Sequence, residues 1–351
     1  KKQIPTMSNY IQKIKKIAQV FFKDPFFLKR WEMPYYEARG RTDNQLSVRA
    51  DYSGSRRYHY NGDSYNFIQH MYTGIMPFAH MSGQREKYPA SIEPNISEKA
   101  DLIASGLADR GYRRFLADAL YDFIQTTSHT LFTFGVALFE VVYEKDEGGN
   151  VTSLKFTHLD HSSMYRFFGN YYQIIPWWVA KRNHVKVQIV KIPTEKILGI
   201  KFPKKLGGRR KLQKTLERLW KLSNELIPKF QMDAMGENKD IGFNLESFTK
   251  AKYLETAKQT SVFGWNQGQA STNYITEYYW FLRYLREVKA QAIVRAEILS
   301  ALNYFLNAPL LNLGVTVSVE NLPTVESIEE QERVMKAGNM EFKNIYDATQ
   351  I

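Results

Sequence analysis

The spacing of apolar residues along the chain predicts three helical segments. Apolar residues recur at three- and four-residue steps in residues 1–30, again from Phe115 to Ile124, and without a break from Tyr274 to Leu306. At 1.5 Å per residue, the last of these helices would be about 50 Å long. A helix of this length without internal caps fits an extended stalk better than a compact small-molecule enzyme.

β-Branched and aromatic residues replace the helical period after the second segment. Gly135 to Tyr143 and Val151 to Leu159 flank a turn at Glu147–Asn150, which predicts a β-hairpin. A second hairpin is expected to turn at Gly169-Asn170. The alternation that ends at Ile189 predicts a further strand with one solvated side.

The remaining pattern completes an α+β fold with a short β segment near its end. Four regions are expected: an N-terminal arm followed by an irregular extended region (1–94), an α+β region (95–200), a basic segment with helices and a Gly-rich loop (201–272), and a long helix with a strand and an acidic helical tail (273–351). Asn95 and Ser97 offer capping side chains for a helix at the start of the second region. The other predicted elements are helices at 209–230 (ended by Pro228), 245–257 and 326–336, and a strand at 315–319.

Composition allows a large core and excludes some classes of protein. Of the 351 residues, 44% are hydrophobic and 14% aromatic, which suits a globular chain with large interfaces. The absence of cysteine excludes disulfides and Cys-ligated zinc, and it permits assembly in a reducing cytoplasm. No segment approaches the roughly 18–20 apolar residues that span a bilayer. The first residues lack the apolar core of a signal peptide, and we expect the chain to be part of a longer protein.

Positive charge is concentrated in one segment. Between Lys181 and Lys221 there are fourteen Lys or Arg and two acids, an excess equal to the +12 net charge of the whole chain. Such a segment is either a solvated face or a surface for a polyanion or an acidic partner, and no base-reading module accompanies it. Any DNA contact is therefore expected to be independent of sequence and dependent on salt. The basic patch candidates are Lys204, Lys205, Arg209, Arg210 and Lys211.

The C-terminal stretch carries the opposite charge. Residues 320–347 contain seven acids and three bases. Ends of opposite sign favour head-to-tail contacts between copies in a ring, although simple solvation gives the same pattern.

No catalytic signature is present. The sequence lacks a P-loop, a dinucleotide-binding glycine motif, a nucleophile elbow and the zinc-protease motif, and it has no thiol nucleophile. The cluster His158-Leu159-Asp160-His161 has the residue types of a metal site, but it lies at a strand end, where Asp and His commonly cap backbone groups. We therefore expect no metal, no cofactor and no enzyme activity.

Several segments resemble portal proteins of tailed bacteriophages. Phe115 to Tyr172 is similar to their wing region, because it joins an amphipathic helix to a "G-x-a-x-x-E-v-x-y" strand at Gly135–Tyr143 and to a turn at Leu159-Asp160. Ile192 to Leu198 resembles the segment that returns to the core. Residues 259–306 resemble a Gly-rich loop followed by a long helix. Ala337-Gly338-Asn339 is similar to a turn near the end of such domains, especially in the Mu-like branch.

The resemblance covers about residues 95–345 and implies a portal-like α+β fold with a wing, long stem or tunnel helices and a short β segment. Residues 1–94 match nothing in the family, and 231–258 is short for the usual clip. The implied protein is a virion head-tail connector, a ring of usually twelve subunits at the capsid vertex, assembled in the host cytoplasm. Double-stranded DNA passes through it during packaging and ejection.

The resemblance also implies partners and a tunnel loop. The implied partners are the major capsid or scaffold protein, the terminase and the tail adaptor, and no membrane is involved.

The candidate DNA contacts in the tunnel loop are Gly264, Asn266, Gln267, Gly268, Gln269, Ser271 and Thr272. Alternatively, this loop is an ordinary helix N-terminus with Ser271 or Thr272 as its cap.

Two other functions stay open at this point. A metal-dependent enzyme acting on nucleic acid would need paired carboxylates, for which Asp160 with Asp240 or Glu246 are the candidates. A peripheral membrane or scaffold protein would use the basic arm of residues 1–30, which contains eight Lys or Arg and a single acid.

Overall fold

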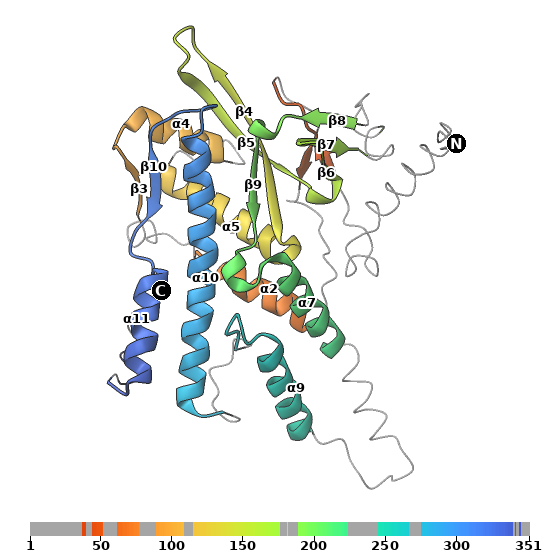
Figure 1. Cartoon of the computed structure of the whole chain (residues 1–351), viewed down its shortest axis with the longest axis vertical. Coiled ribbons are helices and arrows are strands. Elements are labelled where there is room, and N and C mark those ends of the chain that lie inside the picture. The colour runs from red at the N-terminus through yellow and green to blue at the C-terminus, as the bar shows by residue number, and fades with distance from the viewer. Residues whose placement is uncertain are drawn as a thin grey trace, which may run out of the picture.

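The structure is a computed structural model, shown in Figure 1. It describes residues 37–39, 44–51, 62–76, 89–108, 115–175, 181, 189–223, 245–266, 275–339, 341 and 344. These residues form seven α-helices and ten short strands, and all the strand pairs are antiparallel. The predicted α+β class is confirmed.

One long helix, α10 (Glu277–Leu306), runs along most of the molecule (Figure 1). Its N-cap is Thr276, whose side chain accepts a hydrogen bond from the Tyr279 N–H at 3.3 Å. Helices α2 (Asp63–Thr73) and α5 (Leu116–Phe134) pack against one side of α10, and α11 (Val325–Lys336) packs along another. The unbroken spacing of apolar residues follows from this packing, because different neighbours cover α10 along its length.

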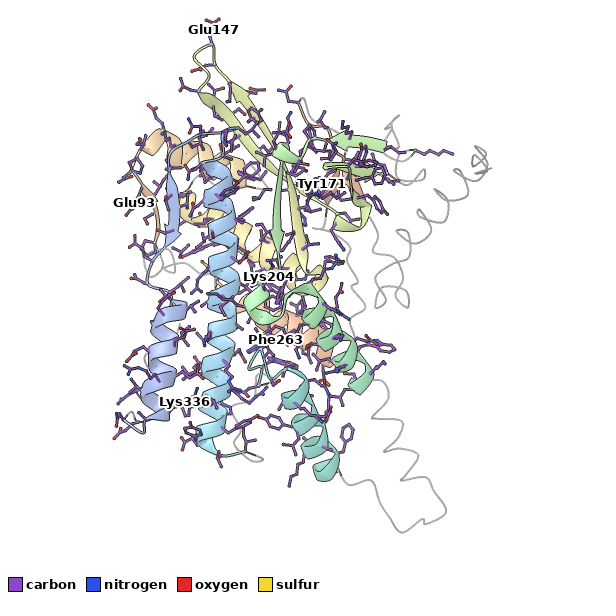
Figure 2. The ribbon with its side chains drawn as sticks, in the orientation of Figure 1. Glu93, Glu147, Tyr171, Lys204, Phe263 and Lys336 are labelled. Carbon is purple, nitrogen blue, oxygen red and sulfur yellow. The ribbon has the colours of Figure 1, made fainter. Side chains whose placement is uncertain are left out.

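A three-stranded sheet lies beside these helices, with the strand order β5-β4-β9. Strand β4 (Val136–Lys145) starts directly after α5, and Gly135 joins the two in the left-handed region at φ 75°. A Cβ atom at this glycine would lie 2.4 Å from Cγ of Arg209. Both the left-handed backbone and this close approach therefore require glycine at the junction. The β4–β5 hairpin extends beyond the helices to its tip at Glu147 (Figure 2).

The smaller sheets surround this centre. Strands β6, β7 and β8 form one sheet in that order, β3 pairs with β10, and β1 pairs with β2. The bounds of the remaining elements are β1 Glu37–Arg39, β2 Arg49–Asp51, β3 Ala90–Glu93, α4 Ser97–Leu107, β5 Val151–Leu159, β6 Met164–Phe167, β7 Asn170–Ile174, β8 Ile189–Ile192, β9 Ile197–Lys201, α7 Gly208–Lys221, α9 Leu245–Gln259 and β10 Thr316–Val319, with 3₁₀ turns η1 His161–Ser163, η2 Thr194–Lys196 and η3 Lys204–Leu206.

The largest hydrophobic cluster contains residues from all four of the expected regions. At its centre the Phe67 ring of α2 makes edge contacts with Phe132, Phe263 and Trp265, at centroid distances of 5.3–6.1 Å. Phe202 extends the aromatic group towards the end of β9. These regions therefore share one core.

A buried carboxylate attaches an early segment to the sheet. Glu140 of β4 is fully buried and accepts hydrogen bonds from the backbone N–H groups of Leu46 at 2.8 Å and Ser47 at 2.7 Å. The amide of Gln173 on β7 bonds both the N–H and the carbonyl of Val48. The glutamate of the motif at Gly135–Tyr143 thus has a structural role, which the sequence pattern did not indicate.

Most of the predicted elements are confirmed. Both hairpins form, although the second turns at Phe168-Gly169, one residue earlier than expected. The helix predicted at 245–257, the long helix, the strand near 315–319 and the acidic helix appear within one to three residues of their predicted bounds. The described part of the helix predicted at 209–230 ends at Lys221.

Three predictions are wrong. Residues 31–95 are not wholly irregular, because α2 buries Phe67, Ile68 and Met71 on one face although its sequence is rich in polar and aromatic residues of low helix propensity. Neither Asn95 nor Ser97 caps α4, whose N-cap is Ile96 with no side-chain hydrogen bond. The cap of α10 is Thr276 rather than Ser271 or Thr272.

Other predictions lie outside the described residues. These are the helix in residues 1–30, the strand positions before Ile189, and the role of Pro228. Over the described part of the chain, no helix is both long enough and apolar enough to cross a membrane.

Candidate polyanion-binding surface

The five basic patch candidates lie together where β9 passes through η3 into α7. Lys204 and Lys205 belong to η3, and the three other cations form the first turn of α7. Gly207 and Gly208, at φ 84° and 65°, make the tight link between them. Their N–H groups donate to Lys204 at 2.8 Å and Pro203 at 3.0 Å, so both are engaged within the turn. The positive charge of this surface comes from the five side chains.

Helix α7 extends this charge along its exposed face. Its apolar face, with Leu212, Leu216 and Leu219, is buried against the core. On the other face, Arg210 and Lys214 are exposed at a spacing of one turn. Lys214 was not among the candidates of the sequence analysis, although the four-residue spacing places it on the same face as Arg210.

Few of these cations have a partner. Arg218 donates to the Gln259 side chain at 2.9 Å, and Lys221 forms an ion pair with Glu217 at 3.3 Å. With the described residues, no ion pair is formed by the other cations of this surface. Partial burial without a carboxylate lowers the pKa of Arg209 from its usual value. The six cations that form no ion pair with any described residue are Lys204, Lys205, Arg209, Arg210, Lys211 and Lys214.

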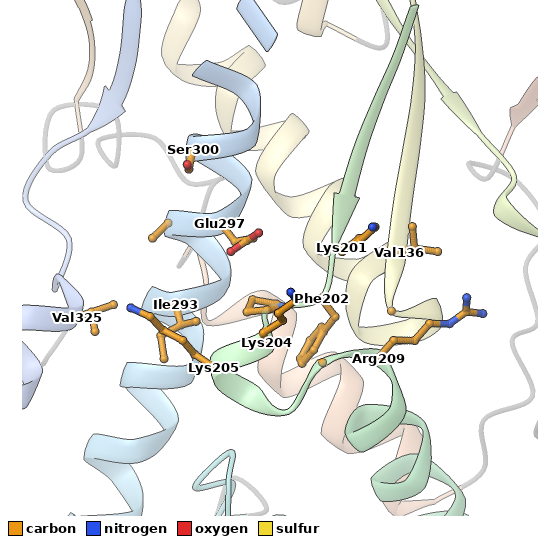
Figure 3. A pocket seen from close by; sticks show the side chains of 14 residues that line it. Val136, Lys201, Phe202, Lys204, Lys205, Arg209, Ile293, Glu297, Ser300 and Val325 are labelled. Carbon is orange, nitrogen blue, oxygen red and sulfur yellow. The ribbon is translucent and has the colours of Figure 1, made fainter. Parts of the chain in front are cut away.

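A groove of about 780 Å³ lies between this surface and α10 (Figure 3). Figure 3 shows Lys205 reaching towards α10, Lys204 beside Phe202, and Arg209 pointing away from α10. Helix α10 contributes Glu297 and Ser300 to the opposite wall. The sequence analysis missed these two residues because they are about ninety positions away from the basic segment, and no motif connects them.

The arrangement is suited to binding rather than to catalysis. Lysine and arginine side chains on an exposed helix face neutralise phosphates without reading bases. Among the described residues that line the groove, Glu297 is the single acid, so these residues offer no pair of carboxylates for acid–base or metal chemistry. The chemistry that the surface supports best is salt-dependent association with a polyanion.

The described part of the expected tunnel loop is buried. Asn266 accepts from Nε of Arg283 at 2.9 Å and donates to the carbonyl of Trp280 at 3.4 Å. A Cβ atom at Gly264 would lie 2.2 Å from the carbonyl oxygen of Arg283, so glycine is required for this close approach. These two residues belong to an internal network and not to an exposed surface. The other candidates, Gln267, Gly268, Gln269, Ser271 and Thr272, lie outside the described residues.

The two histidines of the His158–His161 cluster have separate surroundings, and Nδ1 of His161 lies 3.8 Å from Oδ1 of Asp160. His158 lies 3.3 Å from the hydroxyl of Thr130, and the ring of His161 packs on Phe134 at 4.3 Å between centroids. Burial lowers the pKa of His161 to about 4, which keeps the ring neutral. The described residues contain no group of three or more His, Cys, Asp or Glu that could hold a metal ion. Asp240 and the side chain of Glu246 lie outside them.

No known protein family matches the sequence, and no curated protein matches it either. Among solved structures, the chain is similar to an HK97-family phage portal protein from Corynebacterium diphtheriae. The two chains are 9% identical, with a TM-score of 0.38, and the match covers 74% of this chain and 95% of that one.

Proposed function

We propose that this chain is the subunit of a portal ring, through which double-stranded DNA enters and leaves a phage capsid. The observation that carries the proposal is the order of elements from α5 to α10. Helix α5, the β4–β5 hairpin, the β6–β7 hairpin, strand β9 and the 30-residue helix α10 succeed one another at the residues on which the sequence resemblance to portal proteins rests.

In this function, the basic surface of α7 contacts the phosphate backbone. DNA that slides past a protein needs weak contacts that are the same at every base pair, because base-specific bonds would hold it in register. Arg210, Lys211 and Lys214 supply such contacts, since they are free of ion pairs with the described residues. The loop residues from Gln267 to Thr272 remain candidates for uncharged contacts to the same duplex.

The proposal includes the assembly of the particle. The ring is expected to contain about twelve copies, and to associate with the capsid or scaffold protein, the terminase and the tail adaptor in the virion. It requires no cofactor and no catalytic residue.

The experiment that tests the proposal is mass photometry of the purified full chain, combined with negative-stain electron microscopy. The expected result is a closed ring of about twelve copies with a central hole. A chain that stays monomeric or dimeric over the whole accessible range of concentration and salt contradicts it. A closed ring without affinity for double-stranded DNA would retain the assembly and reject the DNA contact.

A further inference from the structure

The β6–β7 turn presents two aromatic rings to solvent in a strained conformation. Phe168 is 86% exposed and Phe167 is 58% exposed, and their rings contact each other at 4.3 Å between centroids. Phe168 has φ 45°, a left-handed conformation that bulky side chains rarely adopt, and Gly169 follows at φ 75°. Two-residue turns of this kind favour Asn-Gly, so neither local propensity nor burial accounts for a phenylalanine here.

Hydrogen bonds hold this turn in place. The side chain of Asn170 donates to the carbonyl of Phe168 at 3.2 Å, and the hydroxyl of Thr194 in η2 donates to the carbonyl of Gly169. Strand β7 is also paired on both sides, with β6 and β8. The aromatic pair is therefore a preorganised projection, which is the form in which an anchor residue loses least entropy on binding.

The groove beside α10 could receive the aromatic turn, because it combines apolar lining residues with cations at its rim. Apolar side chains make up much of its lining, including Phe202, Ile293 and Val325, and Lys204 and Lys205 lie at its rim (Figure 3). Duplex DNA has no apolar group that needs such a floor, because its accessible backbone is phosphate and sugar. An aromatic side chain fits the apolar lining, and an acid beside it fits the lysines at the rim.

Charged side chains lie beside the turn and in the lining of the groove. Glu195 is exposed in η2, next to the Thr194 that binds the turn, and Arg166 is exposed on β6 next to Phe167. The groove offers Lys204 and Lys205 to the acid, and Glu297 to the arginine. Lys201 and Arg209 also line the groove, so its charge is mainly positive and favours the acid beside the turn.

The two features lie apart within one molecule. Figure 2 shows Tyr171 of β7 in the small sheet at the upper right and Lys204 at the centre, beside α10. A projection on one part of a chain that fits a hollow on another part joins copies head to tail, and such contacts close into a ring or continue as a filament. We infer that the Phe167-Phe168 turn of one copy inserts into the groove between α10 and η3 of a second copy. This inference rests on the proposed function for the closed ring.

It also divides the basic surface between two roles. Lys204 and Lys205 line the groove and serve the contact between copies, whereas Arg210, Lys211 and Lys214 on α7 remain for DNA. Neutralising the first pair is therefore expected to affect assembly, and neutralising the second set to affect DNA binding.

The test compares assembly of the full chain and its variants by mass photometry over a concentration series. Phe168→Ser removes the anchor, and Ala296→Trp fills the groove from α10. Each is expected to raise the concentration for half-assembly by about tenfold or more, as the loss of a buried aromatic anchor does. The matched control is Tyr65→Ser on α2, another exposed aromatic, which should leave assembly unchanged.

A charge exchange makes the test independent of folding defects. Glu195→Lys alone, or Lys204→Glu with Lys205→Glu, should weaken assembly, and the three changes together should restore it. If the wild-type chain forms rings and Phe168→Ser forms them equally well, the inference fails while the proposed function stands. If the wild type never assembles, both fail. Loss of binding to phosphatidylserine vesicles by Phe168→Ser, with assembly intact, would overturn the contact between copies in favour of a membrane contact.

Discussion

Two arginines of α10 and the cations at the start of α7 differ in burial and in their partners. Arg283 and Arg295 of α10 are buried and surrounded by oxygen acceptors from other elements. The cations at the start of α7 are exposed and form no ion pair with the described residues. The difference shows that the number of basic residues does not identify a binding surface, because only the second set has charge left for a partner.

The arginines of α10 connect segments. Arg283 is fully buried and donates to Ala257 at 2.9 Å, to the hydroxyl of Thr260 at 3.1 Å and to Asn266 at 2.9 Å, so it fastens the end of α9 to α10. Arg295 donates to the carbonyl oxygens of Ile75 and Pro323, and burial lowers its pKa to about 10. Both guanidinium groups satisfy backbone carbonyls that would otherwise be buried without a donor.

The largest effect is expected on stability, from removing a buried arginine of α10. Arg283→Met should lower the free energy of unfolding by about 3–5 kcal/mol, because it leaves several buried acceptors without a donor. Urea unfolding followed by circular dichroism measures this loss. Arg286→Met, one turn further along the less buried side of α10, is the control and should cost about 0.5 kcal/mol or less. A loss below about 1 kcal/mol for Arg283→Met would show that these acceptors find other partners.

A smaller effect is expected from neutralising the exposed cations at the start of α7. It changes DNA binding rather than stability. Arg210→Gln, Lys211→Gln and Lys214→Gln together should weaken binding of a double-stranded oligonucleotide by about 10- to 100-fold. They should also reduce the slope of log affinity against log salt by about 3. Fluorescence anisotropy over a salt series measures both quantities. The stability of the variant should change by less than about 0.5 kcal/mol.

The matched control removes the same charge elsewhere. Lys145, Lys155 and Lys250 lie on β4, β5 and α9, away from the start of α7, and their exchange for glutamine should leave most of the affinity. Equal losses for the two triple variants would mean that DNA responds to net charge alone. The α7 surface would then have no special role.

The sequence predicted the elements better than it predicted their contacts. Hairpins and the long helix follow from local patterns, namely the change of period at Gly135 and the unbroken apolar spacing before Leu306. Helix α2 was missed because burial of Phe67 and Met71 against distant residues outweighs its low helix propensity.

The candidate site was predictable only in part. The concentration of Lys and Arg identified the basic surface, since the five candidates are close together in sequence. The opposite wall of the groove, with Glu297, comes from α10 and depends on tertiary packing. Asn266 was expected to contact DNA because its segment resembles a tunnel loop, but its side chain is buried and accepts a hydrogen bond from Arg283.

The smallest effect is a pH dependence of the free energy of unfolding, which arises from the contact between His70 of α2 and Glu287 of α10. Glu287 of α10 binds the His70 ring at 2.5 Å and the N–H of Asn266 at 3.3 Å, and its hydrogen bond raises the pKa of His70 above the ordinary 6.5. Because the folded state holds this proton more tightly than the unfolded state, the stabilisation is complete below pH 6.5 and is lost as the pH rises through the raised pKa. The ring is 40% exposed, so solvent screening limits the effect to about 0.5 kcal/mol. Urea unfolding at about pH 6 and about pH 8.5 should therefore show a smaller pH difference for His70→Gln than for the wild type, and an equal difference in both would contradict the role of Glu287. His70 lies on α2 and is not one of the cations of the α7 surface, so DNA affinity should respond equally to pH in the two proteins.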